Sequence, residues 1–216
     1  MIRLAIFDLD GVLTSTSDQH FEAWQALFKT TFDIELDHRF ESLTRGISRM
    51  DSLEVLLKQY NLDLDEPTKA MLIHQKNEHY LKLTENFDPT HVYPGVVKCL
   101  DYLKSKGLKL ALASASRNGK PLLKALALEP YFDFVVDPTS VPSKPHPDIF
   151  LAAMHHFGFT PNECIGFEDA VAGIESIRSA GMTAIGIGPE VLTKAHYKYE
   201  SIESINLADF NLMIGK

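Results

Sequence analysis

Short apolar runs recur along this chain, with segments of helical periodicity between most of them. The first run, Leu4 to Phe7, is typical of a fully buried strand, and the runs 108–113, 132–136, 164–167 and 183–187 predict further strands. Apolar spacing of three and four residues predicts helices at 96–103, 121–126 and 170–180, and one that opens at 143–148 and continues to 157. This alternation over short connections indicates an α/β fold, a doubly wound, Rossmann-like parallel sheet.

A different pattern separates the first strand from the others. From about Thr16 to Asn86 the chain has few glycines and no convincing strand, and its apolar positions follow helical spacing. Gly46 lies in a break at 44–49 that predicts a loop, and Asp51 then supplies acid to the first turn of the next helix. We therefore expect an α/β core domain of residues 1–15 and 93–216, interrupted by an all-helical domain at 16–92, which we call the helical insert.

The composition narrows the class of partner. Of the 216 residues, 45% are hydrophobic and 23% charged, an ordinary globular balance, and the formal net charge is −8. Such an acidic chain is a poor match to a phosphate backbone, so we expect no nucleic acid partner, although a local basic pocket for a small phosphorylated molecule is compatible with it. Cys99 and Cys164 are too few for a disulfide framework. We find no signal peptide and no membrane-length apolar run, and expect a cytoplasmic monomer that does not bind membranes.

Four polar clusters follow predicted strands or open predicted helices: Asp8 with Asp10, Ser114, Lys144, and Glu168 with Asp169. Because the carboxyl ends of parallel strands share one edge of a sheet, we expect these clusters to converge. Several carboxylates brought together need a cation, and oxygen ligands without zinc-type Cys/His spacing favour Mg²⁺. A carboxylate nucleophile, a metal, a lysine and a hydroxyl together suit phosphoryl transfer through an aspartyl phosphate.

Each cluster also has a plain structural interpretation when it is read alone. The segment 8–11 is good turn chemistry, 114–118 can be a loop that caps a helix, and acid at 168–169 suits a helix N-terminus. Lys144 can be a solvated loop lysine. It is the presence of all four clusters in one chain that favours a catalytic site.

Taken together, these motifs are specific to a known family. The segment DLDGVLT at 8–14, with Ser114, Lys144 and the acidic pair at 168–169, resembles the signature motifs of the haloacid dehalogenase superfamily. Within it, the segments FDLDGVLTSTSDQHFEAW, RGISRMDSL and LASASRNG and the pair Lys76-Asn77 resemble the β-phosphoglucomutases. Two departures affect substrate fit: Arg117 stands where that family more often has lysine, and Ser15 where relatives commonly have a carboxylate.

The resemblance implies a role for each catalytic residue. Asp8 would be the nucleophile, and Asp10 the general acid and base. The Asp10 carbonyl, Asp8, Asp169 and Glu168 would hold Mg²⁺, while Ser114 and Lys144 would stabilise the transferring phosphoryl group.

It also implies a substrate site that the helical insert closes as a cap. Arg49, Ser116, Arg117 and Asn118 would hold a distal phosphate. Further residues would contact the sugar or couple cap closure to Asp10: His20, Trp24, Gly46, Ile47, Ser48 and Lys76. For Trp24, a purely structural place in a helix core remains an equal alternative, because its apolar neighbours recur at helical spacing.

The expected reaction is the Mg²⁺-dependent interconversion of β-D-glucose 1-phosphate and glucose 6-phosphate through β-glucose 1,6-bisphosphate. A sugar-phosphate phosphatase, in which water dephosphorylates Asp8, is the alternative. A catalytically silent binding protein on the same fold is a third interpretation, and the intact Asp8, Asp10, Lys144 and Asp169 argue against it.

Overall fold

The computed structural model describes residues 1–188, 192–207 and 210–211. Its sheet has the strand order β3-β2-β1-β4-β5-β6, and every neighbouring pair is parallel. The strands are β1 (Leu4–Phe7), β2 (Lys109–Leu112), β3 (Phe134–Val135), β4 (Cys164–Glu168), β5 (Thr183–Ile187) and β6 (Tyr197–Tyr199). The predicted α/β fold with a doubly wound parallel sheet is confirmed.

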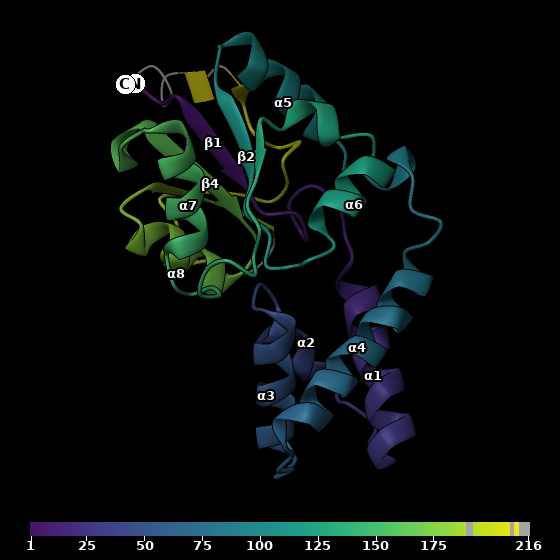
Figure 1. Ribbon diagram of the computed structural model, residues 1–216. Helices are drawn as coiled ribbons and strands as arrows, with labels where there is room; N and C mark the ends of the chain where they lie inside the picture. Colours follow the sequence, from purple (N-terminus) through teal and green to yellow (C-terminus); the bar gives the residue numbers. More distant parts are fainter. Residues whose placement is uncertain (189–191, 208–209, 212–216) are drawn as a thin grey trace.

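Helices cover both faces of this sheet (Figure 1). On one face lie α5 (Val96–Ser105) and α6 (Gly119–Ala125), and on the other α7 (Asp148–Phe157) and α8 (Val171–Ser179). Single-turn 3₁₀ helices occur at Pro89–His91, Glu129–Tyr131 and Pro161–Glu163. None of the helices in the described part of the chain is long and apolar enough to cross a membrane.

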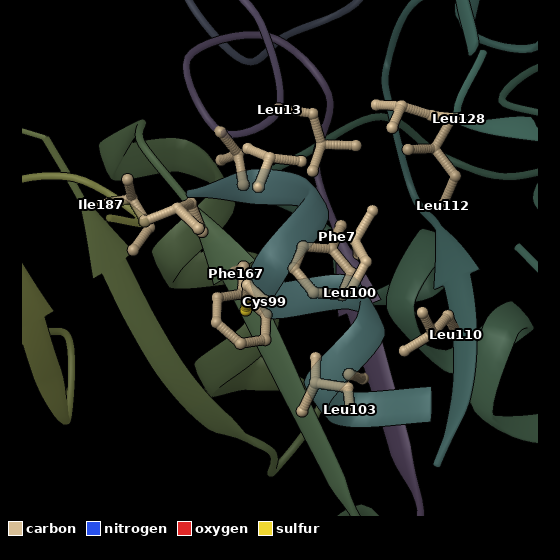
Figure 2. Close-up of a cluster of buried hydrophobic side chains, with 14 of the residues drawn as sticks. Phe7, Leu13, Cys99, Leu100, Leu103, Leu110, Leu112, Leu128, Phe167 and Ile187 are labelled. Carbon is tan, nitrogen blue, oxygen red and sulfur yellow. The ribbon is translucent and has the colours of Figure 1, made fainter. Parts of the chain in front are cut away.

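The two faces of the sheet pack differently because side chains alternate along each strand. On the α5 and α6 face, large side chains meet, and the Phe7 and Phe167 rings stack with centroids 4.3 Å apart (Figure 2). On the α7 and α8 face, Gly166 of β4 lets α8 approach closely. A methyl group at Gly166 would meet the Ile177 side chain at 2.7 Å, so this position needs glycine.

The helical insert consists of α1 (Ser17–Phe32), α2 (Arg39–Thr44), α3 (Arg49–Gln59) and α4 (Glu66–Leu83). These helices pack around a hydrophobic cluster that contains only residues of the insert, among them Trp24, Phe28 and Leu56. In Figure 1 they extend away from the carboxyl end of the sheet as a separate bundle. The chain enters and leaves this bundle side by side, because Thr14 forms a bridge with Val92.

Several predicted boundaries need correction. Helix α3 starts at Arg49 and not at Asp51, because the Ser48 hydroxyl accepts a hydrogen bond from the Asp51 backbone N–H and caps the helix there. The strand expected at 132–136 is reduced to Phe134–Val135, since a 3₁₀ turn ends at Tyr131. Strand β6 was not predicted, because three residues at a sheet edge carry too little apolar pattern.

Candidate active site

The four predicted polar clusters meet at the carboxyl edge of the sheet. The order of strands reverses at β1, so Asp8 after β1 and Glu168 at the end of β4 lie beside each other at the switch point. A cavity of about 720 Å³ opens there between the core and the helical insert. Of the predicted site residues, all but Asn118 and Glu168 line this cavity.

Lys144 holds two of the carboxylates together. Its Nζ donates to Asp8 Oδ1 and to Glu168 Oε1, each at 2.6 Å, and all three side chains are buried. Burial alone would lower the pKa of Lys144, but the two carboxylates raise it above its usual value. Glu168 Oε2 accepts from the Ala170 backbone N–H at 2.8 Å, so both oxygens of this side chain are hydrogen-bonded.

Negative charge remains in excess around this lysine. Asp8, Glu168 and Asp169 each place one carboxylate oxygen within 4.8 Å of the others. Burial raises the pKa of Asp8 to about 6 and that of Asp169 well above its usual value, and neighbouring carboxylates add to both shifts. One lysine does not balance three carboxylates. The hard oxygen atoms of these carboxylates fit a divalent cation such as Mg²⁺.

Asp10 lies where the first strand turns toward the insert. Burial raises its pKa to about 7, and the charge of Asp8 contributes to the rise. The Thr16 hydroxyl donates a hydrogen bond to Asp10 Oδ1. His20 Nε2 is 3.9 Å from Asp10 Oδ2, so a side chain of α1 reaches the same carboxylate. Asp10 is therefore held by residues from the start of the insert.

Two buried side chains of α4, Lys76 and Tyr80, contact His20. Lys76 Nζ lies 2.6 Å from His20 Nδ1, and the Tyr80 ring stacks on the imidazole with centroids 4.2 Å apart. Burial, followed by the nearby charge of Arg49, lowers the pKa of Lys76 to about 7. Burial and the charges of Lys76 and Arg49 lower the pKa of His20, so the imidazole is neutral at pH 7. Trp24 lines the cavity and also belongs to the insert's core, with Lys76 Nζ 5.2 Å from its ring centroid.

A second positively charged region lies where the insert faces the loop after β2. Arg49 stands in the first turn of α3, not in the loop predicted for it, and burial together with the charge of Arg117 lowers the pKa of its guanidinium. The Asn77 side-chain oxygen accepts from Arg49 Nη2 at 2.6 Å and from Asn118 Nδ2 at 2.9 Å. One oxygen thus receives donors from both domains. Ser116 also lines this part of the cavity.

The remaining predicted residues, Gly46, Ile47 and Ser48, belong to a segment of the insert that contacts the core. Ser143 Oγ accepts from the Ser48 backbone N–H at 2.9 Å, and Arg45 Nη1 lies 3.8 Å from Asp169 Oδ2. Gly46 and Ile47, between these two contacts, line the cavity. The sequence predicts no individual role for Thr16, Arg45, Asn77 or Ser143. The first three lie in segments that carry the family resemblance, and Ser143 lies where a helix is predicted to open.

Comparison with known proteins agrees with this geometry. The family model of haloacid dehalogenase-like hydrolases matches residues 2–181. The chain is 40% identical over 195 residues to a β-phosphoglucomutase of Bacillus subtilis, covering 87% of this chain and 84% of that protein. It is 30% identical over 192 residues to a phosphorylated carbohydrates phosphatase of Thermotoga maritima, with 85% and 84% covered.

A solved structure extends the likeness to the whole chain. The crystal structure of a β-phosphoglucomutase from Clostridium difficile superposes with a TM-score of 0.95 at 36% identity, covering 100% of this chain and 98% of that one. The fold, the convergence of the motifs and these relatives lead to one assignment. The chain is an enzyme of the haloacid dehalogenase superfamily, within the group that contains sugar-phosphate mutases and phosphatases.

Proposed function

We propose that this enzyme is a Mg²⁺-dependent β-phosphoglucomutase that interconverts β-D-glucose 1-phosphate and glucose 6-phosphate. The observation that carries the proposal is the pairing of two regions in one cavity. Asp8 and Lys144 form one region of the cavity wall, and the two arginines Arg49 and Arg117 form a second, positively charged region of the same wall. A bisphosphate intermediate needs two such regions, and a mutase must bind it in either orientation.

Asp8 is the proposed nucleophile. Its carboxylate oxygen attacks the phosphorus atom, the bond from phosphorus to the sugar oxygen breaks, and an aspartyl phosphate forms. Lys144, 2.6 Å from Asp8 Oδ1, neutralises charge on the phosphoryl oxygens, and the Ser114 hydroxyl donates a hydrogen bond to them. Mg²⁺, held by the carboxylates of Asp8 and Asp169, the Asp10 carbonyl and Glu168, would supply further positive charge to that group.

Asp10 is the proposed general acid and base. It protonates the sugar oxygen that leaves and later removes the proton from the sugar hydroxyl that attacks the aspartyl phosphate. Burial raises the pKa of Asp10 in the metal-free site, which helps this carboxyl group hold a proton as a general acid must. Thr16 and His20 orient this carboxyl group from the insert side.

The distal phosphate would bind between the two domains. Arg49 offers a bidentate fork, and Arg117, Ser116 and Asn118 add charge and donors from the core loop. The sugar would lie between the two phosphate regions, against His20, Trp24, Gly46, Ile47, Ser48 and Lys76. The helical insert acts as the cap, which keeps water from the phosphoenzyme while the sugar reorients.

A sugar-phosphate phosphatase is the second candidate, because the Thermotoga relative at 30% identity carries that name. Both activities share the chemistry of Asp8 and Lys144. They differ in the group that accepts the phosphoryl group, which is water in a phosphatase and a sugar hydroxyl in a mutase. His20, Arg49 and Lys76 of the insert line the cavity and would hold the sugar bisphosphate, which favours the mutase.

A coupled assay with β-glucose 1-phosphate and a trace of the bisphosphate distinguishes the two candidates. The mutase forms glucose 6-phosphate without a matching release of inorganic phosphate. Phosphate released from many sugar phosphates, with no isomerisation, would overturn the proposal in favour of the phosphatase.

A further inference from the structure

Arg45 links the helical insert to a proposed metal ligand. It follows α2 directly, and its Nη2 donates to Glu41 Oε1 at 2.8 Å, one helical turn back. Its Nη1 lies 3.8 Å from Asp169 Oδ2, across the boundary between the insert and the core. The Arg45 side chain is 25% exposed and that of Asp169 only 9%, so solvent screens this charge pair weakly.

The approach of Arg45 is set by packing as well as by charge. Gly46 has a positive φ of 77° and lies against Ala170, which follows Asp169. A Cβ at Gly46 would meet the Ala170 Cβ at 2.8 Å, so only glycine lets the loop come this close. The guanidinium of Arg45 is thereby held beside the acidic cluster whenever the insert is seated on the core.

Arg45 also lies between two cavities. The main cavity of about 720 Å³ and a smaller one of about 250 Å³ are both lined by Glu41, Arg45 and Asp169. The smaller cavity is also lined by Ser15, the last residue before the insert, and by Asp18 in α1. Arg45 therefore lies at the edge of the main cavity, beside the acidic cluster.

We propose that Arg45 is a positioning residue of the helical insert that sets the Mg²⁺ affinity of the acidic cluster, and that Glu41 moderates its effect. The inference rests on the metal site of the proposed function and extends it. With the insert seated, the guanidinium supplies part of the positive charge that Asp169 needs, and so competes electrostatically with a divalent cation at the same cluster.

Thermodynamic reciprocity then couples the metal to the insert. When the substrate-free insert closes on the core, Arg45 approaches Asp169 and weakens Mg²⁺ binding. By linkage, bound Mg²⁺ must then weaken closure of the insert by the same factor. Metal loading would favour an open, substrate-accepting enzyme. A sugar phosphate, whose charge attracts the arginines of the insert, would then restore closure over the loaded site.

Direct titration of the full-length protein with Mg²⁺ by calorimetry, without substrate, tests the inference apart from catalysis. For Arg45→Gln we expect the Kd for Mg²⁺ to fall by roughly fivefold, as for one partly screened charge near a divalent ion. For Glu41→Gln we expect a rise of about the same factor, because the guanidinium loses its local counter-charge. Arg45→Lys, which keeps the charge, should stay within about twofold of the wild type.

Two further comparisons control for structure. Arg39→Gln makes the same change of net charge on α2, at a side chain that is 71% exposed and pairs with Asp37, and should leave the Kd unchanged. Merely structural damage at Arg45 would weaken Mg²⁺ binding, which is the opposite sign. An unchanged or raised Kd for Arg45→Gln would overturn the inference while leaving the proposed metal site intact. Absence of Mg²⁺ binding by the wild type would overturn the metal site itself, and the inference with it.

Discussion

Replacing Lys144 with methionine tests whether the buried carboxylates depend on this one cation. The side chain is fully buried, with its Nζ 2.6 Å from both Asp8 and Glu168, so methionine keeps much of the volume and removes the charge. Removing one partner from a buried ion pair costs about 3–5 kcal/mol, because the remaining charge has no counter-ion. For a chain of this size, that corresponds to a fall in Tm of roughly 6–20 °C.

The loss should depend on pH. The pKa of folded Asp8 is already about 6 with Lys144 present, against an unperturbed 3.8, and removing the lysine raises it further. The folded variant then binds a proton over a wider pH range than the unfolded chain. Its stability deficit relative to wild type is therefore largest near pH 8 and shrinks as the pH falls toward 5, where Asp8 is protonated in the folded state.

Thermal unfolding at pH 5 and pH 8, without Mg²⁺, measures both effects. Lys29→Met is the matched control, since Lys29 also lies between two carboxylates, Asp33 at 2.7 Å and Glu35 at 3.4 Å, but on an exposed surface. Its Tm should change little at either pH. A Lys144→Met variant with the same deficit at both pH values would refute the electrostatic reasoning and point to lost packing instead.

Three further outcomes follow from the same geometry. Asp8→Asn should abolish turnover and the hydroxylamine-sensitive aspartyl phosphate, measured by intact mass, while raising Tm at pH 8, because folding raises the Asp8 pKa to about 6 and therefore opposes the ionised carboxylate at that pH. Because folding raises the pKa values of Asp8, Asp10 and Asp169, metal-free stability should fall as the pH rises from about 4 to 7, and Mg²⁺ should raise Tm more at pH 8 than at pH 5 in a melting series. Asn77→Asp places a carboxylate beside Arg49 where a phosphate would bind, so KM for the sugar phosphate should rise about tenfold with little change in kcat, in steady-state kinetics.

The sheet and its motifs could be predicted because their signals are local. A run such as Leu4 to Phe7 is apolar throughout since it is buried on both faces, and Asp8 after it marks the carboxyl end of the strand. The edge strand Tyr197–Tyr199 lacks that signal, because its residues are largely exposed. Acid at Asp51 predicts a start for helix α3 that is two residues too late, because the cap of this helix is Ser48.

Contacts between the insert and the core could not be predicted in the same way. That Ser143 accepts from the Ser48 N–H, 95 positions away, depends on how a bundle of helices seats on a sheet. The same holds for Arg45 beside Asp169 and for Asn77 between Arg49 and Asn118. Side-chain identity fixes which groups can pair, but tertiary packing decides which pairs form.

The two chain crossings into the helical insert are adjacent. The Thr14 hydroxyl donates to the His91 carbonyl at 2.7 Å, and the Tyr93 N–H donates to the Leu13 carbonyl at 2.9 Å. Since the ends already meet and the insert has its own hydrophobic cluster, a short turn from Ser15 to Tyr93 could close the core with little loop entropy. The insert is in this sense a detachable module. Grafting a foreign helical bundle at this junction could change which phosphorylated compounds reach Asp8 while the sheet and its carboxylates stay as they are.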